Sequence, residues 1–288
     1  MAAELDAPAI AAAFSQPDND GSFSGELETY LKGLGKSCPA VLFAFAPKAA
    51  GTFLRTAAVR AINGQLVRTV YAQGGRDAQP YLPIFIRYYL GLLGERPLVT
   101  HVHMQALPAN RRFIETLDLK PIVMIRPIKD MLASYWDMLE SDDQALLDGL
   151  NCRFPPDFRG LSRERKADFL VDMLGPWYAS YFATWLQYAD DDPDRVCVLN
   201  YDELQSSPER VLEKALAHAG LTRPPEVCAA AVHLVWQERE KHRFHRGETG
   251  RGSDYFSPRH IACIDRMLSY YSALDRFADR LAGQTDAV

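Results

Sequence analysis

The segment PKAAGTFLRT, Pro47–Thr56, decides the fold of this chain. It follows directly on the apolar run Ala40–Ala46, whose length and flanking residues predict a buried strand. It also opens the predicted helix Thr52–Asn63, which is stopped by an Asn-Gly pair. The segment is therefore the turn between a buried strand and a helix.

The residues of this turn are suited to bind an anion. Gly51 lets the backbone approach a ligand closely, Thr52 offers a hydroxyl and a helix cap, and Lys48 adds a positive charge. The start of a helix presents N–H groups and the positive end of the helix dipole, so the segment predicts a cradle for phosphate or sulfate. The alternative is a plain strand–turn–helix with a surface lysine, and the Walker A pattern GxxxxGK[ST] is absent.

Predicted strands alternate with predicted helices along the rest of the chain. The strands are Gln65–Tyr71, Leu98–His101, Pro121–Ile125 and Arg195–Asn200. The helices are Tyr81–Leu93, Ile128–Glu140, Ala167–Ala189 (bent or divided at Pro176), Pro208–Gly220, Pro225–Lys241 and Pro258–Leu281. This alternation predicts an α/β fold with a mostly parallel central sheet flanked by helices. Ligands of such sheets bind beyond the carboxyl ends of the strands.

A second segment, RPIKDMLASYW, also follows a predicted strand. Arg126 stands at the end of that strand, and Ser134 lies eight residues further on, within a predicted helix. Arg supplies a rigid fork of N–H donors for phosphate, and Ser supplies a hydroxyl. Two strand ends that each carry an anion-binding group suit a ligand with two separated phosphates.

Together the two segments resemble the nucleotide-binding motifs of the sulfotransferases that use 3′-phosphoadenosine 5′-phosphosulfate (PAPS), PKSGTTW and RxPxDxxxSxY. Asn200–Leu204, followed by Ser207–Glu209, resembles the family's YEDL…P segment. Phe244–Gly250, followed by Tyr255–Ser257, resembles its late FRKGxxG…F loop. The four stretches occur in the family's order and span almost the whole globular part. The resemblance implies a P-loop-like sulfotransferase fold and an enzyme that transfers sulfonate from PAPS.

The resemblance also implies which residues bind PAPS. They come from all four stretches: Lys48, Ala49, Ala50, Gly51 and Thr52 at the sulfonate and 5′-phosphate; Phe53 and Tyr201 at the adenine; Arg126, Ser134, His245, Arg246 and Gly247 at the 3′-phosphate. The run Ala49-Ala50-Gly51 replaces the family's Ser-Gly-Thr, so side-chain hydroxyls are lost and the glycine is displaced by one position.

The catalytic base of the family is a His shortly after a mid-chain strand, with Leu-Pro some residues later. The stretch LVTHVHMQALP matches this pattern, and its Leu-Pro pair places the register on His101. His103 is an alternative base, on the same face if the strand continues, and either histidine could instead be structural. The family often has Lys where this chain has Val99.

The implied mechanism is in-line displacement without a metal. His101 takes the acceptor's proton, while Lys48, the helix start and Thr56 stabilise the leaving bisphosphate.

The composition limits the classes of partner. The chain has 288 residues, with 32 Lys and Arg against 37 Asp and Glu, and a formal net charge of −5. Surfaces that bind nucleic acid are usually basic, which argues against DNA or RNA as the main partner. The five cysteines are scattered singly, without zinc spacing, and their odd number disfavours a disulfide framework. This pattern indicates a reducing compartment and no metal site.

We expect neither a signal peptide nor a membrane-spanning segment in this sequence. Its longest membrane-like stretch, Tyr81–Leu93, is far shorter than the roughly 20 apolar residues that a span requires. We therefore expect a soluble, cytoplasmic protein. We expect a flexible tail over residues 1–25 and a single domain over residues 26–288, with the oligomeric state open.

The acceptor remains open among phenols, alcohols, amines, sugars and lipids. Phe85, Tyr88 and Tyr89 have helical spacing, which favours ordinary core packing over an apolar acceptor channel. The stretch Glu140–Lys166 is predicted to be a long loop or lid. Two other functions compete: a P-loop-type nucleotide-dependent kinase, which the missing Walker residues disfavour, and a non-catalytic protein that binds adenosine bisphosphate.

Overall fold

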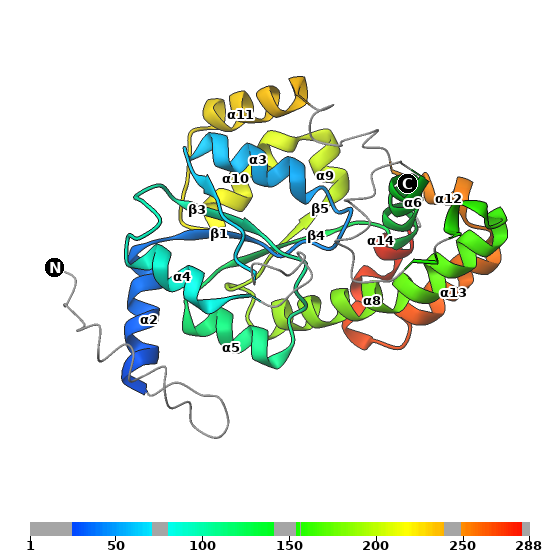
Figure 1. Cartoon of the computed structure of the whole chain (residues 1–288), viewed down its shortest axis with the longest axis horizontal. Coiled ribbons are helices and arrows are strands. Elements are labelled where there is room, and N and C mark those ends of the chain that lie inside the picture. Colours follow the sequence, from blue (N-terminus) through cyan, green and yellow to red (C-terminus); the bar gives the residue numbers. More distant parts are fainter. Residues whose placement is uncertain (1–24, 71–79, 141–153, 156, 239–248, 284–288) are drawn as a thin grey trace.

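The computed structural model describes residues 25–70, 80–140, 154–155, 157–238 and 249–283. Within these residues the chain forms a sheet of five parallel strands in the order β2-β3-β1-β4-β5 (Figure 1). The strands are β1 (Ala40–Phe43), β2 (Gln65–Leu66), β3 (Leu98–His101), β4 (Pro121–Ile125) and β5 (Cys197–Asn200). The predicted α/β fold with a parallel central sheet is confirmed.

The register of the sheet aligns the carboxyl ends of β1 and β3, whereas β4 continues beyond them to Ile125. Phe43, the last residue of β1, is opposite His101 on one side and Ile122 on the other. Every residue of β1, β3 and β4 is buried. A strand that is buried on both faces has a continuous apolar sequence, which explains why the runs AVLF and PIVMI identify these strands.

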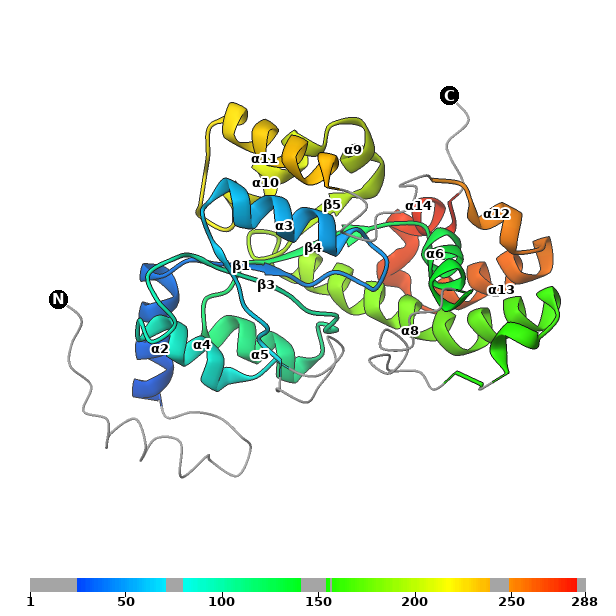
Figure 2. The ribbon, with the colours of Figure 1, turned by 45° about the horizontal axis from the view of Figure 1, so that its top comes forward.

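Helices cover both faces of the sheet (Figures 1 and 2). One face carries α3 (Gly51–Ala61), α9 (Tyr201–Ser206), α10 (Pro208–His218) and α11 (Pro225–Gln237). The other carries α2 (Gly25–Ser37), α4 (Leu82–Tyr89), α5 (Pro108–Thr116) and part of α8 (Arg163–Asp191). The remaining elements gather beyond the strand ends: α6 (Ile128–Glu140), η1 (Phe158–Gly160), α12 (Gly252–Tyr255), α13 (Pro258–Leu268), η3 (Ser272–Phe277) and α14 (Ala278–Ala282).

The longest helix, α8, crosses from beneath the sheet to this outer group. Ser162 caps its start by accepting a hydrogen bond from the Arg165 backbone N–H at 3.4 Å. Pro176 lies inside the helix, yet the helix is continuous and is not divided there. The face after the proline is buried, with Tyr178, Tyr181 and Trp185 in the core. Tertiary packing of these large side chains outweighs the local cost of the proline.

Several predicted element boundaries are confirmed and one predicted helix is wrong. Leu98–His101, Pro121–Ile125 and Ile128–Glu140 match the structure at both ends. The predicted single helix Pro258–Leu281 is instead broken into α13, η3 and α14. The break follows Leu268, because Tyr271 is extended and the chain turns so that Leu274 enters the core. The helical spacing of apolar residues continues across this break, so periodicity alone could not reveal it.

Other predictions differ in extent. The predicted strand Gln65–Tyr71 forms regular strand only at Gln65–Leu66, although the Val67 N–H still donates to the Val99 carbonyl at 3.0 Å. The helices α2 and α5 were not predicted. The end of the predicted loop Glu140–Lys166 contains η1 and the start of α8.

The aromatic residues of α4 belong to the core. Phe85 is fully buried against Phe113, with ring centroids 5.3 Å apart. The Tyr88 hydroxyl donates to the Pro39 carbonyl at 3.1 Å, and that of Tyr89 to the Leu117 carbonyl at 3.5 Å. The core interpretation of these side chains is therefore confirmed. Among the described residues, no helix is long and apolar enough to span a membrane.

Candidate functional site

The turn after β1 has an alternating backbone conformation. Lys48 and Ala50 are left-handed, with φ of 66° and 64°, whereas Ala49 and Gly51 do not have positive φ. The Ala49 N–H donates to the Ala46 carbonyl at 3.2 Å and so closes the turn. Alternating handedness over successive residues curves the backbone into a concave nest whose N–H groups attract anions. The turn therefore has the backbone shape of an anion cradle.

The start of α3 adds to this cradle. The first N–H groups of a helix have no acceptor within the helix. Ala50 is the N-cap residue and has no side-chain oxygen, so it makes no capping hydrogen bond. An anion placed here would accept from the first-turn N–H groups at the positive end of the helix dipole. The Thr56 hydroxyl, by contrast, donates to the Thr52 carbonyl at 2.7 Å and is engaged inside the helix.

His101 lies directly against the cradle. A Cβ atom added to Gly51 would stand 2.2 Å from Cε1 and 2.3 Å from Nε2 of His101. The imidazole therefore occupies the space that any side chain at position 51 would need. This contact explains why the glycine stands at 51 rather than at 50, where the PKSGTTW pattern has it. Because the glycine is displaced to position 51, an alanine has to adopt the unfavourable left-handed conformation at position 50.

The second candidate base is adjacent. The rings of His101 and His103 are 5.0 Å apart, and Phe45 packs edge-on against His101 with centroids 6.1 Å apart. His101 is buried at the end of β3, and His103 is half-buried in the segment that follows. Position 99, where the family often has Lys, is a fully buried valine in β3 and therefore supplies no positive charge to the cradle.

Arg126 joins the two motif segments. Its Nη1 donates to the Lys48 carbonyl at 2.5 Å, and its guanidinium lies 4.0 Å from the centre of the Tyr201 ring. Burial raises the pKa of Tyr201, and the positive charge of Arg126 opposes that rise, so the phenol stays neutral. The structure thus places Lys48, Arg126 and Tyr201 together. Ser134, in the second turn of α6, is half-buried.

A cavity of about 700 Å³ opens beside the cradle on the α11 side of the sheet. Phe53 and Trp236 form part of its wall, with rings perpendicular and centroids 6.1 Å apart. Tyr201 lines it as well, and the other lining residues are Leu204, Gln205, Pro208, Glu209, Ala229, Val232, His233 and Thr249. This volume suits a nucleoside, and aromatic walls are typical of small-molecule sites.

Sequence reasoning missed two residues of this region. Trp236 is 45% exposed at the end of α11. An exposed tryptophan in an apolar helix was the signal that could have found it. Asp130 is fully buried and accepts from the backbone N–H groups of Gly250 at 2.8 Å and Gly252 at 2.7 Å. It docks the segment after residue 248 onto the start of α6.

The predicted residues His245, Arg246 and Gly247 lie outside the described residues. Ala49, Ala50, Gly51, Thr52 and Phe53 all lie in the turn and the first turn of α3, as the pattern predicts. Their assignment to a ligand stays a prediction.

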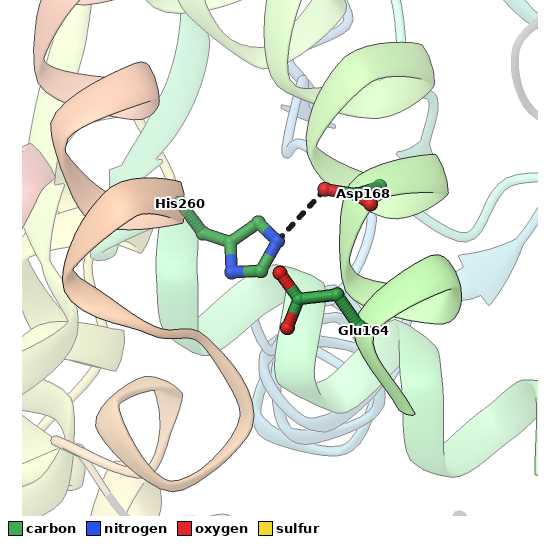
Figure 3. Close-up of side chains that lie close together, drawn as sticks. All are labelled: Glu164, Asp168 and His260. Atoms are coloured by element: carbon green, nitrogen blue, oxygen red, sulfur yellow. Dashed lines mark hydrogen bonds and ion pairs between the residues drawn. The ribbon is translucent and has the colours of Figure 1, made fainter. Parts of the chain in front are cut away.

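Within the described part of the chain, Glu164, Asp168 and His260 are the group whose ligand atoms are close enough together to hold a metal ion (Figure 3). The Ser257 N–H donates to His260 Nδ1 at 3.2 Å, so Nε2 carries the proton and donates to Asp168 at 3.1 Å. Binding a metal through Nε2, the nitrogen that faces Asp168, would need the opposite tautomer, with Nδ1 donating and Nε2 unprotonated.

A cation already occupies this cluster. Arg259 donates to Glu164 at 2.7 Å and also to Asp168. The hydrogen bonds and charges of Arg259, and then of His260, lower the pKa of Asp168. Glu164 and Asp168 belong to α8, whereas Arg259 and His260 belong to α13. The cluster therefore joins two helices, and its chemistry does not fit a metal centre.

Comparison with known proteins decides the family. The sulfotransferase domain family matches residues 90–243, which is more than half of the chain. The chain belongs to the sulfotransferase domain family. The match includes His101, Arg126 and Tyr201 of this sulfotransferase domain, whereas the cradle precedes it, so the cradle rests on its own geometry.

Solved structures share the fold. Mouse sulfotransferase SULT7A1 complexed with PAP has a TM-score of 0.57 at 15% identity, with 87% of this chain and 92% of that chain covered. A sulfotransferase from Alicyclobacillus acidocaldarius has a TM-score of 0.49 at 14% identity, with 85% and 96% covered. At these identities the likeness to the mouse enzyme shows the fold alone. A search of curated proteins finds no match.

Replacing Ala50 with Gly should stabilise the protein. A left-handed conformation costs an L-residue roughly 1–2 kcal/mol, and the larger unfolded-state entropy of Gly offsets about 0.4–1 kcal/mol of the gain. We expect the free energy of unfolding in urea to rise by about 0.5–1 kcal/mol. The control is Ala49→Gly, at the neighbouring buried position without positive φ, which should destabilise. Destabilisation by both variants would contradict the left-handed conformation at 50.

Replacing Gly51 with Ala should displace the His101 ring. The overpacking should lower the free energy of unfolding by about 1–3 kcal/mol. His101→Ala removes the obstructing ring, so the double variant should be more stable than the sum of the two single changes predicts. Strictly additive changes in urea unfolding would show that the two residues are not in contact.

Proposed function

We propose that this chain transfers the sulfonate group of PAPS to a hydroxyl or amine of a small-molecule, sugar or lipid acceptor. The observation that carries the proposal is the contact between His101 and Gly51. An imidazole can act as a general base and a helix start can bind an anion, and sulfonate transfer uses two such groups side by side. Membership of the sulfotransferase domain family supports the same reaction.

The described residues fit PAPS at both ends. The alternating turn at Lys48–Gly51 and the uncapped start of α3 suit the phosphosulfate. The cavity between Phe53, Trp236 and Tyr201 suits the adenosine. Arg126 contacts both Lys48 and Tyr201 and so lies between the cradle and the cavity. Together with Ser134 it would hold the 3′-phosphate. PAP is the ligand of the mouse structure that shares this fold, which supports the same nucleotide here.

In the proposed reaction PAPS supplies the sulfonate, and adenosine 3′,5′-bisphosphate is released. His101 accepts the proton of the acceptor's hydroxyl or amine as the new bond to sulfur forms. Lys48 and the first-turn N–H groups of α3 stabilise the negative charge that develops on the leaving phosphate. Burial of His101 keeps water away from the reacting proton. His103, 5.0 Å away, remains the alternative base.

The wider assignments are part of the proposal. We propose that residues 26–288 act as one domain, with His245, Arg246 and Gly247 closing over the 3′-phosphate. Asp130 supports this placement, because it holds Gly250 and Gly252 against the helix that carries Ser134. The four cysteines in the described part of the chain are free of disulfides, which supports a reducing, cytoplasmic location.

Adenosine 3′,5′-bisphosphate should stabilise the protein without Mg²⁺. At a hundredfold excess over Kd, binding to the folded state contributes about 2.7 kcal/mol. For a chain of this size that is a rise of about 5–10 °C in Tm in a thermal-shift titration. ATP with Mg²⁺ should have little effect. Stabilisation by ATP–Mg²⁺ alone would favour a kinase and contradict the proposal.

His101→Ala should abolish sulfonate transfer and leave bisphosphate binding nearly intact. Loss of a general base typically lowers the rate by about 10²–10⁴-fold. The measurement is bisphosphate release from PAPS across a panel of phenols, alcohols, amines, sugars and lipids. His103→Ala is the matched control and should retain most of the activity. The reverse pattern would assign the base to His103, and binding of bisphosphate without transfer to any acceptor would favour a non-catalytic binder.

A further inference from the structure

Lys48 is a left-handed residue whose two flanking carbonyl groups are both held by side chains from elsewhere in the fold. The Tyr178 hydroxyl, from α8, donates to the Pro47 carbonyl at 2.8 Å. Arg126 Nη1, after β4, donates to the Lys48 carbonyl at 2.5 Å. A left-handed conformation at a residue other than Gly persists only where surrounding contacts impose it. These two hydrogen bonds are such contacts.

The geometry of the peptide group shows what each bond controls. A trans peptide is planar, with its C=O and N–H pointing in opposite directions. Tyr178 therefore orients the plane between Pro47 and Lys48, which sets φ of Lys48. Arg126 orients the next plane, which sets ψ of Lys48. Together the two donors determine the direction in which the Lys48 side chain leaves the backbone.

We infer that Tyr178 is a positioning residue for sulfonate transfer, because it and Arg126 hold Lys48 in its left-handed conformation beside the sulfonate. This inference rests on the proposed function, which assigns the Lys48 ammonium to the developing charge. Tyr178 lies outside the four stretches that resemble the family motifs. It is fully buried, so the hydrogen bond to Pro47 is shielded from water.

Tyr181 provides a matched control. It stands three residues after Tyr178 on the same helix and is equally buried. Its hydroxyl donates to the Ala44 carbonyl, three residues before Pro47. Phe at either position removes one buried hydroxyl and keeps the ring. Both variants should therefore lose similar stability, and only Tyr178→Phe should release the peptide plane next to Lys48.

The test compares Tyr178→Phe, Tyr181→Phe, Lys48→Ala and Lys48→Ala with Tyr178→Phe in the full chain. We expect Tyr178→Phe to lower kcat about tenfold, as for one lost hydrogen bond, with a smaller change in KM for PAPS. Tyr181→Phe should stay within about twofold of wild type at a similar Tm. In single-turnover measurements on the Lys48→Ala background, Tyr178→Phe should cause no further loss.

Two outcomes would overturn the inference. Equal losses of kcat in Tyr178→Phe and Tyr181→Phe would show that both act only through stability. A full tenfold loss on the Lys48→Ala background would show that Tyr178 does not act through Lys48.

Hydrogen exchange of a peptide covering residues 44–56 separates this inference from the proposed function. Faster exchange in Tyr178→Phe than in Tyr181→Phe would support the hold on Lys48 even if the wild-type chain transferred no sulfonate from PAPS. In that case the proposed function would fail and the structural role would stand. Unchanged exchange in Tyr178→Phe would overturn the role whatever the activity.

Discussion

The left-handed turn at Lys48 and Ala50 lets the chain pass from the buried end of β1 into α3 within a few residues. This backbone conformation is unfavourable for both residues, and neighbouring elements must hold it. Tyr178 from α8 and Arg126 after β4 do so by donating hydrogen bonds to the carbonyl groups of Pro47 and Lys48. His101 lies against the end of this turn, at Gly51. The conformation of this short turn therefore depends on how β4 and α8 are placed.

The contact between His101 and Gly51 adds a second constraint. The imidazole fills the space of a side chain at 51, so glycine is required there. The next residue toward the N-terminus then adopts the left-handed conformation as alanine. The arrangement brings the imidazole of His101 into direct contact with the start of α3. The left-handed alanine thus lowers the stability of the turn, while the glycine at 51 permits the close contact with His101.

The charge of the chain and the charge of the site differ in sign. The net charge is −5, yet Lys48, Arg126 and the positive end of α3 meet at the carboxyl edge of the sheet. Elsewhere, arginines form ion pairs that connect helices, such as the pairs of Arg259 with Glu164 and Asp168. A few converging cations are enough for an anionic ligand, so the net charge argues against nucleic acid as the main partner but not against a nucleotide.

By itself the sequence determined the parallel sheet and the position of the cradle. Continuous apolar runs identify strands buried on both faces, and Gly, Lys and Thr between a strand and a helix predict a turn suited to an anion. Tertiary structure alone decided the break after Leu268, the place of Trp236 beside Phe53, and the partners of the Pro47 and Lys48 carbonyl groups. These features depend on residues far apart in the chain. Local propensity and periodicity depend only on residues close together in the sequence, so only the packed fold reveals these contacts.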